Sequence, residues 1–225
     1  MHDDVRLTPE LLTRAYAQGI FPMGDDRTGT VRWYAPDPRA HLPLDAFHAP
    51  HNLRRRVRRR EFSVTSDEAF EAVIRACADR ERTWITPRLI RVYTRLHERG
   101  RAHSVECWQD GSLAGGLYGV ALGGAFFGES MFFRVSNASK VALVHLVRQL
   151  RAGGFTLLDT QYSTAHLERF GVVEIPRADY MERLDAALSV DAPWWPLSDR
   201  AAADLDRPVS SLAATSPGNE EDGNG

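Results

Sequence analysis

Two short polar segments, each following an apolar run, carry side chains suited to proton transfer and hydrogen bonding. One is Glu129, in the segment GESMF (128–132), which has aromatic and methionine neighbours on both sides. A carboxylate in apolar surroundings is costly to keep charged unless it is paired. Glu129 is therefore a candidate catalytic group, and a structural ion pair is the alternative.

The second segment is LLDTQ (157–161), which contains Asp159 and Gln161. Side chains two apart on a strand face the same way, so these two groups are expected side by side at the strand's end. The carboxyl end of a strand is a common place for active groups. An aspartate at a strand end often acts as a cap instead, and that alternative stays open.

Apolar and aromatic side chains around these segments could form a substrate pocket or simply pack a core. The candidate pocket residues are Leu117, Phe126, Met131, Leu143 and Leu146. A base of a nucleic acid could stack on a tryptophan or tyrosine, with packing as the alternative. The candidates for stacking are Trp33, Tyr34, Trp84 and Trp108.

A run of six arginines in seven positions, RRRVRRR (54–60), stands out in a chain of net charge −2. Such a run neutralises phosphates and releases counterions, which favours a nucleic-acid partner. A solvated basic face without a partner is the alternative. The candidate phosphate contacts are Arg54, Arg55, Arg56, Arg58, Arg59 and Arg60.

Three regions are expected from composition and turn residues. Residues 1–38 form a small N-terminal domain and connector, with a helix over 8–18 that begins at the cap Thr8. The proline-rich segment 33–44 is extended. Residues 39–207 form the main domain, and the acidic tail 208–225 is disordered because it has little to bury.

The pattern of the main domain predicts a mixed α/β (α+β) fold, in which helices flank a central, mainly antiparallel sheet. Glycine-punctuated β-rich segments over 103–128 predict an antiparallel meander. Ser66 and Asn137 are expected to cap helices. The expected elements are strands at 61–65 and 155–161 and helices at 66–78, 87–100, 137–152, around His166 and at 179–188.

Several function classes lack their sequence signatures. The chain has no apolar run of 18 residues, and its first residues, MHDDVRLTPELL, do not form a secretory signal. Cys77 and Cys107 match no metal-binding spacing and are expected to be buried, reduced thiols. No Walker loop, HExxH or GxSxG occurs, and the acetyl-CoA signature fails at its last position, Thr156. We therefore expect a cytoplasmic protein without membrane, metal or cofactor.

Taken together, eight stretches in consistent order resemble the bacterial leucyl/phenylalanyl-tRNA–protein transferases. GESMF, NASK and EIPRxxY are the most specific parts. The resemblance implies a small N-terminal domain and a larger acetyltransferase-like (GNAT) domain that does not use acetyl-CoA. The stretches are AYAQGIFPM (15–23), WYAPDPRA (33–40), TWIT (83–86), LHERGRAHSVECW (96–108), LAGGLYGVALGGAFFGESMF (113–132), NASKVAL (137–143), LLDTQ (157–161) and HLERFGVVEIPRADY (166–180).

The resemblance also implies an activity and its partners. An aminoacyl-tRNA would donate leucine, phenylalanine or methionine to the N-terminal Arg or Lys of an acceptor protein, which is then degraded. No cofactor is implied, because the ester bond to tRNA is already activated. Two alternatives are a non-catalytic RNA-binding module and another aminoacyl-tRNA-dependent transferase, such as a peptidoglycan-bridge enzyme, although those chains are much longer.

Individual roles follow from the same resemblance. The five apolar candidates would line the pocket for the aminoacyl side chain, and the arginine run would track tRNA phosphates. Trp108 would stack on the terminal adenine, and Glu129 would hydrogen-bond near the ribose or the incoming ammonium. Asp159 would polarise the Gln161 amide, which would orient the attacking amine. The sequence departs from the family pattern at Met23, often tryptophan, and at Leu146, where phenylalanine is expected.

Overall fold

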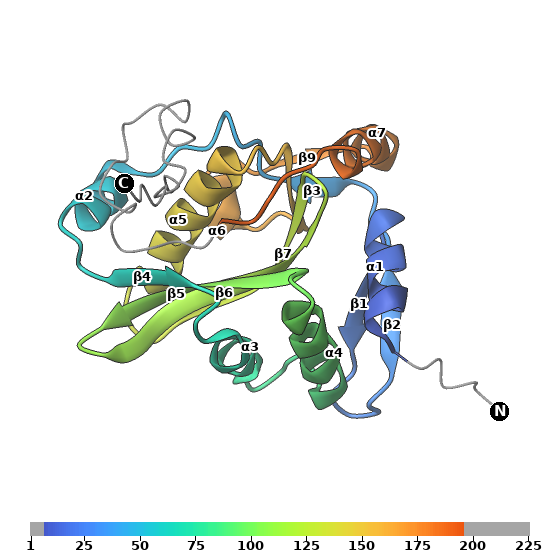
Figure 1. The fold of residues 1–225 in the computed structure, drawn as a ribbon, viewed down its shortest axis with the longest axis horizontal. Coiled ribbons are helices and arrows are strands. Elements are labelled where there is room, and N and C mark those ends of the chain that lie inside the picture. Colours follow the sequence, from blue (N-terminus) through green and yellow to red (C-terminus); the bar gives the residue numbers. More distant parts are fainter. Residues whose placement is uncertain (1–6, 196–225) are drawn as a thin grey trace, which may run out of the picture.

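A computed structural model of the chain describes residues 7–195, whose largest element is a seven-stranded sheet (Figure 1). Its strands follow the order β4-β5-β6-β7-β8-β3-β9, and only β7 and β8 run parallel among its neighbouring strands. The strands are β3 (Arg39–His41), β4 (Ser63–Ser66), β5 (Ala102–Gln109), β6 (Ser112–Leu122), β7 (Ala125–Phe133), β8 (Leu157–Gln161) and β9 (Val173–Ile175).

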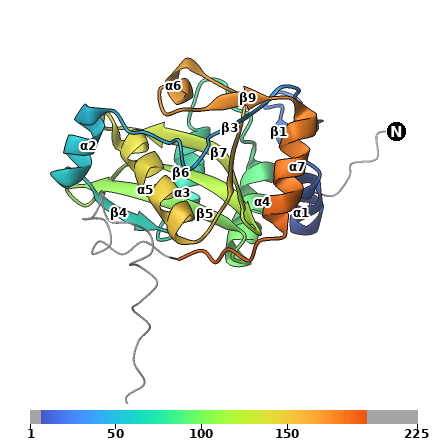
Figure 2. The same cartoon turned by 90° about the horizontal axis from the view of Figure 1, so that it is seen from above.

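Helices cover both faces of this sheet, and each face has its own apolar core. One core is built with α1 (Pro9–Ala17), α3 (Phe70–Ala78), α4 (Pro87–Glu98) and α7 (Arg177–Leu188). The other is built with α2 (His51–Arg58) and α5 (Ala138–Ala152), with the short α6 (Ala165–Glu168) beside it. The predicted fold class is therefore confirmed. Figures 1 and 2 show α2 at one end of the molecule and α1 and α7 at the other.

Two of the predicted helix starts are confirmed by their caps. Thr8 precedes Pro9 and accepts a hydrogen bond from the Leu11 amide, and Thr86 does the same ahead of Pro87. These threonines satisfy amide groups that a helix start leaves without intrahelical partners. A proline in the first turn costs no hydrogen bond, so sequence alone locates such starts well.

Of the two other predicted caps, Ser66 is wrong, whereas Asn137 stands at the predicted N-cap position but makes no capping bond through its side chain. Ser66 belongs to β4 and pairs with Val105, so α3 begins only at Phe70. Asn137 precedes α5 with a left-handed backbone (φ 72°) and caps no amide through its side chain. Its carboxamide oxygen accepts instead from the Lys140 ammonium at 3.3 Å. Both side chains suit a cap chemically, but β pairing and backbone geometry direct them elsewhere.

The predicted meander is confirmed as β5, β6 and β7, and it contains an irregularity that matters for function. Tyr118 of β6 lies opposite Ser130, whereas the next residue, Gly119, lies opposite Gly128. Glu129 is therefore the extra residue of a bulge in β7. Bulges re-aim side chains and are frequent beside active sites.

A second irregularity separates β7 from β8. Their parallel pairing covers only three positions, from Ala125 opposite Leu157 to Phe127 opposite Asp159. Beyond this point, Glu129 on β7 and Gln161 on β8 lie on strands that no longer pair with each other. The gap between the two strand ends is where a cavity opens.

The N-terminal segment packs closely on the rest. It contains α1 and a hairpin of β1 (Phe21–Gly24) and β2 (Val31–Tyr34), and its Leu12 and Tyr16 belong to the same core as α3 and α4. The predicted boundary at residue 38 stays a prediction, and the predicted disordered tail lies outside the described residues. Within residues 7–195, no helix is long and apolar enough to span a membrane.

Candidate active site

The cavity between the ends of β7 and β8 has a volume of about 270 Å³ and two kinds of wall. Apolar side chains make up one part of the lining, here called the apolar wall, and polar groups make up the rest, called the polar wall. Six of the predicted site residues line it: Leu117, Glu129, Met131, Leu143, Leu146 and Gln161. The other lining residues are Arg80, Trp84, Tyr118, Gly128, Ser130, Leu158, Thr160, Thr164, His166 and Leu167.

Three predicted site residues are not brought to the cavity surface. Phe126 is fully buried and its ring stacks on Trp194, with the ring centres 5.6 Å apart. Trp108 lies on β5, where its indole N–H donates to the Thr65 hydroxyl at 2.9 Å. Asp159, the third, lies beneath the cavity and is fully buried. A tryptophan does line the cavity, but it is Trp84, from the loop before α4.

Glu129 projects from the β7 bulge into the cavity and receives hydrogen bonds from three sides. The Tyr16 hydroxyl donates to Oε1 at 2.7 Å and the Tyr93 hydroxyl donates to Oε2 at 3.0 Å. The Gln161 side-chain amide lies 3.5 Å from Oε1. Burial raises the pKa of Glu129 to about 7, although the two phenol hydrogen bonds oppose that rise.

Asp159 is held quite differently, in a buried ion pair. Arg39 binds both carboxylate oxygens, with Nε–Oδ1 and Nη2–Oδ2 distances of 2.9 and 2.5 Å. The Tyr180 hydroxyl donates to Oδ2 at 3.0 Å. The guanidinium also donates to the Gly19 carbonyl and lies 4.8 Å from the ring centre of Phe21. Asp159 therefore ties several elements together beneath the site.

Gln161 connects these two carboxylates. Its backbone N–H donates to Asp159 Oδ1 at 2.9 Å, while its side-chain amide faces Glu129. Its φ of 60° is left-handed, a conformation uncommon in residues other than glycine and frequently associated with functional sites. The expected contact between Asp159 and the Gln161 side-chain amide is thus replaced by a contact with the backbone, because Gln161 departs from regular strand geometry.

The sequence analysis missed four residues of these two networks: Arg39, Tyr180, Tyr16 and Tyr93. The first three lie in stretches that carry the family resemblance, within WYAPDPRA, EIPRADY and AYAQGIFPM. The first two stretches also meet directly, because the Arg177 amide donates to the Asp37 carboxylate at 3.0 Å. The only available signal was the specificity of these motifs, since the contacts join positions far apart in the sequence.

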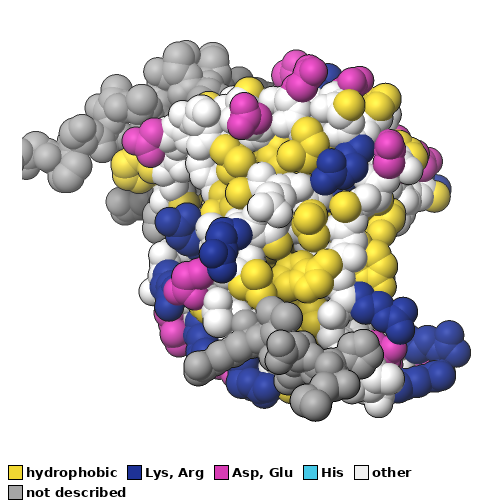
Figure 3. Space-filling model, turned by 90° about the vertical axis from the view of Figure 1, so that its right-hand side faces the viewer, with side chains coloured by type: hydrophobic (Ala, Val, Ile, Leu, Met, Phe, Trp, Pro, Cys, Tyr) yellow, Lys and Arg dark blue, Asp and Glu magenta, His cyan; other side chains and the backbone are white. Residues whose placement is uncertain are grey.

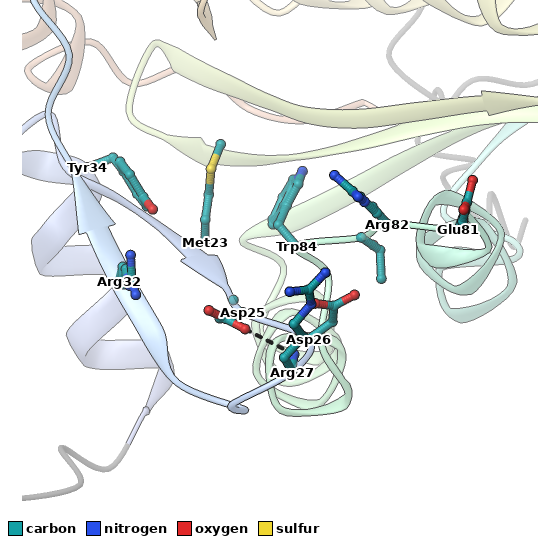
Figure 4. Close-up of a pocket in the computed structure, with 11 residues that line it drawn as sticks. Met23, Asp25, Asp26, Arg27, Arg32, Tyr34, Glu81, Arg82 and Trp84 are labelled. Carbon is teal, nitrogen blue, oxygen red and sulfur yellow. Dashed lines mark hydrogen bonds between the residues drawn. The ribbon is translucent and has the colours of Figure 1, made fainter.

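A larger groove of about 710 Å³ adjoins the cavity between the β1–β2 hairpin and the loop before α4 (Figure 4). Trp84 lines both spaces, and its carbonyl accepts from the Gly24 amide at 2.9 Å, which joins the loop to the hairpin. The remaining groove wall is mostly polar and carries charges of both signs, and Met23 points into it in Figure 4. The charged lining residues are Asp25, Asp26, Arg27, Arg32, Glu81 and Arg82.

The predicted phosphate-binding run lies mainly on α2, at the far end of the molecule from the hairpin (Figures 1 and 2). Leu53 and Val57 are buried against the core, so the helix is anchored by its apolar face. Arg56 pairs with Glu61 at 2.5 Å. Arg54, Arg55, Arg58, Arg59 and Arg60 are exposed to solvent. The run thus presents a basic surface.

Cys77 and Cys107 are both buried and free, as the sequence predicts. Burial raises the pKa of the Cys77 thiol to about 12. A thiol that stays protonated at neutral pH is a poor nucleophile. The chemistry of the site therefore falls to its oxygen and amide groups.

Comparison with known proteins gives two matching family models and several close relatives. The family model for the leucyl/phenylalanyl-tRNA protein transferase matches residues 41–185, and the model for the N-terminal domain of the same transferase matches residues 5–37. A relative of that name from Salinibacter ruber is 75% identical over 228 residues, covering all of both chains. Another from Gloeobacter violaceus is 57% identical over 186 residues, covering 83% of this chain and 96% of the relative.

Solved structures show only a loose similarity. The C-terminal domain of a putative lysylphosphatidylglycerol synthetase from Agrobacterium fabrum is 14% identical, with a TM-score of 0.39. The match covers 89% of this chain and 70% of that one. Sequence similarity, in contrast, extends over both parts of the chain at high identity. The chain belongs to the leucyl/phenylalanyl-tRNA protein transferase family.

Proposed function

We propose that the protein transfers an amino acid from aminoacyl-tRNA to the N-terminal amine of an acceptor protein. The carrying observation is one cavity that combines an apolar wall with a carboxylate that titrates near neutral pH, Glu129. Leucine, phenylalanine or methionine would be the donor residue, and proteins with N-terminal Arg or Lys the acceptors. The products would be marked for degradation, and the reaction would take place in the cytoplasm, where charged tRNA occurs.

The apolar wall suits the side chain of the donor amino acid. Leu117, Met131, Leu143 and Leu146 line it, and these unbranched or γ-branched side chains match donor groups of the same kind. One methylene more or less in such a pocket is worth roughly 1–3 kcal/mol. The pocket therefore favours a class of large apolar side chains rather than a single one.

Trp84 would receive the terminal adenine of the tRNA in place of Trp108. It lies where the apolar cavity meets the polar groove, so an ester at that junction places its acyl group on one side and its nucleotide on the other. Aromatic side chains stack on bases. In the view of Figure 3, hydrophobic side chains gather in the middle of the face, with Lys and Arg side chains among and around them.

The polar wall would handle the attacking amine. Glu129 accepts a proton from the acceptor's ammonium group, and Gln161 orients the resulting amine. The amine attacks the ester carbon and forms a tetrahedral intermediate, whose collapse breaks the ester bond and releases the 3′ oxygen of tRNA, which takes up a proton. Because the ester is already activated, the site mainly supplies positioning and electrostatic stabilisation. The 2′-hydroxyl of tRNA is an alternative carrier of the proton.

Transfer itself is tested by incubating the protein with radiolabelled leucyl-tRNA and a protein that starts with arginine, without ATP. We expect label to appear in the acceptor protein, and the same acceptor with a blocked N-terminus to stay unlabelled. If tRNA binds and no label is transferred, a non-catalytic RNA-binding module explains the site better.

The arginine run is tested through the salt dependence of tRNA binding. Replacing Arg55 and Arg59 with alanine removes two exposed charges of the run. Each lost phosphate contact should lower the slope of log affinity against log salt by about 0.7–0.9, and weaken binding at low salt. Arg75→Ala, which removes an exposed arginine on α3, is the matched control and should leave the slope unchanged. An unchanged slope in the double variant would contradict the assignment.

A further inference from the structure

The two phenol groups that bind Glu129 come from outside the strands that form the cavity. Tyr16 is on α1, in the N-terminal segment, and Tyr93 is on α4. Both side chains are fully buried, and their hydroxyl oxygens lie 2.5 Å apart. Each carboxylate oxygen of Glu129 contacts one phenol hydroxyl, Oε1 that of Tyr16 and Oε2 that of Tyr93, and the two hydroxyls are also hydrogen-bonded to each other.

We propose that Tyr16 and Tyr93 are positioning residues that hold the Glu129 carboxylate in its ionised form and so set the pH range in which transfer runs. The inference rests on the proposed function, because it assumes that Glu129 takes up the proton of the amine. It assigns a role to two residues on the helices α1 and α4, which are separate elements from the strand β7 that bears Glu129.

Hydrogen-bond chemistry explains why two phenols favour the charged carboxylate. An ionised carboxylate accepts at both oxygens, whereas a protonated one must donate from one of them. Burial and the nearby Glu129 charge raise the pKa values of both phenols, so the hydroxyls remain donors at neutral pH. Protonating Glu129 would turn one of its oxygens into a donor, so the phenol that donates to that oxygen would have to rotate its hydroxyl and accept instead. The two phenol hydrogen bonds accordingly lower the pKa of Glu129 against the effect of burial.

Other charged and titratable groups face Glu129 from neighbouring elements, and they act in opposite directions. The negative charge of Asp159 on β8 raises the pKa of Glu129, and the positive charge of Arg39 on β3 lowers it. Tyr118 on β6 lies in the same electrostatic neighbourhood, but its buried hydroxyl lacks a hydrogen-bond partner among the described residues. Arg80 donates to the Met131 carbonyl at 2.6 Å. The Gln161 side-chain amide on β8 also faces Oε1, at 3.5 Å, so the two phenols at 2.7 and 3.0 Å are the nearer donors to the carboxylate.

Geometry also makes the position of the Glu129 carboxylate depend on its contacts with the two phenols. It is the bulged residue of β7, and β7 and β8 have separated at this level, so regular sheet pairing constrains it less than its neighbours. Two donors on two helices restrict where the carboxylate can point. Because α1 supplies one of them, the N-terminal segment is part of the site rather than an appendage.

The test compares Tyr16→Phe and Tyr93→Phe with the unmodified protein. Each variant removes one phenol donor and keeps the ring that packs in the core. Single-turnover transfer should rise with pH through a midpoint near 7 in the unmodified protein, as Glu129 loses its proton. Losing a donor should raise that midpoint by about one pH unit, which means roughly tenfold slower transfer below it and near-normal transfer at high pH.

Two controls separate this effect from others. The acceptor's own amine also titrates in a similar range. In Glu129→Gln, the remaining pH dependence of transfer reports the titration of that amine alone. Tyr118→Phe removes a buried hydroxyl of the same cluster that makes no hydrogen bond, and it should leave the midpoint in place whatever it does to the rate. Carbon-13 NMR of labelled glutamate follows the Glu129 carboxyl directly, without relying on transfer.

The outcomes are distinct. Higher midpoints in both phenylalanine variants, by NMR and by rate, support the proposal. Normal transfer with unmoved midpoints overturns it while leaving the proposed function intact, whereas absence of transfer in the unmodified protein overturns the proposed function. If one variant does not fold, the other tests the same claim, and a Glu129 carboxyl that titrates near 4 in the unmodified protein overturns it independently.

Discussion

Two carboxylates on neighbouring strands of one sheet lie in contrasting environments. Asp159 is fully buried and is neutralised by a bidentate contact with Arg39. Glu129 faces a cavity and, among the described residues, is hydrogen-bonded by uncharged partners, two phenols and an amide. Gln161 touches both, one through its backbone and the other through its side chain.

The difference indicates which carboxylate can do chemistry. A proton acceptor must be reachable by the substrate and must titrate near the working pH. Glu129 meets both conditions, since it lines the cavity and has a pKa of about 7. The carboxylate oxygens of Asp159 instead accept hydrogen bonds from Arg39, Tyr180 and the backbone N–H of Gln161, away from the cavity surface. Environments that differ in this way commonly separate a working group from a supporting one.

The largest effect is expected from Glu129→Gln, which keeps the size of the side chain and removes its ability to take up a proton. Single-turnover transfer should fall by about 10²–10⁴, the usual range for a positioned proton-transfer group. The melting temperature should stay nearly unchanged, because no buried cation loses its partner. A loss below tenfold would indicate that the 2′-hydroxyl of tRNA carries the proton and that Glu129 only orients groups.

Asp159→Asn should instead affect stability first. It leaves the buried Arg39 guanidinium without a charged partner, which typically costs about 3–5 kcal/mol of unfolding free energy. In a chain of this size that corresponds to a melting temperature lowered by roughly 10 °C. Glu71→Gln, which breaks an exposed arginine pair on α3, is the matched control and should cost less than about 1 kcal/mol. Full stability in Asp159→Asn would end the distinction between the two carboxylates.

Local patterns predicted most of the fold. Threonine–proline pairs located the starts of α1 and α4, and glycine-separated β-rich segments located the meander. The apolar spacing of Phe70, Val73, Ile74 and Cys77 placed α3, although Ser66 proved to be part of a strand. These features succeed because each depends on neighbours within a few residues.

The site was less predictable because its contacts join distant positions. Arg39 and Asp159 are 120 residues apart, and Tyr16 and Glu129 are 113 apart. A bulge at Glu129 and a left-handed backbone at Gln161 break the alternation on which strand reasoning relies. The choice between Trp84 and Trp108 likewise depends on where the loop before α4 lies, which neither composition nor spacing determines.

The smallest effect, and the sharpest comparison, is expected from Gln161→Ala. The change keeps the backbone N–H that donates to Asp159 and removes the side-chain amide that faces Glu129. We expect transfer to slow by about tenfold, the order of one hydrogen bond to a charged group. Gln161→Asn, which keeps a carboxamide and tolerates the left-handed backbone, should recover part of that loss.

Double variants then show which carboxylate the Gln161 side chain serves. If it works through Glu129, adding Gln161→Ala to Glu129→Gln should slow transfer little further, because the partner of the amide has already lost its charge. Because the Gln161 side chain does not touch Asp159, adding Gln161→Ala to Asp159→Asn should slow transfer by the same factor as Gln161→Ala alone. The two rate effects, whatever the size of the one from Asp159→Asn, should then multiply. Rates are measured well below the melting temperature of the least stable variant, so that unfolding does not contribute. In the reverse pattern, the rate losses would multiply with Glu129→Gln and overlap with Asp159→Asn. That result would mean that the Gln161 side chain acts through Asp159, the carboxylate of the buried pair.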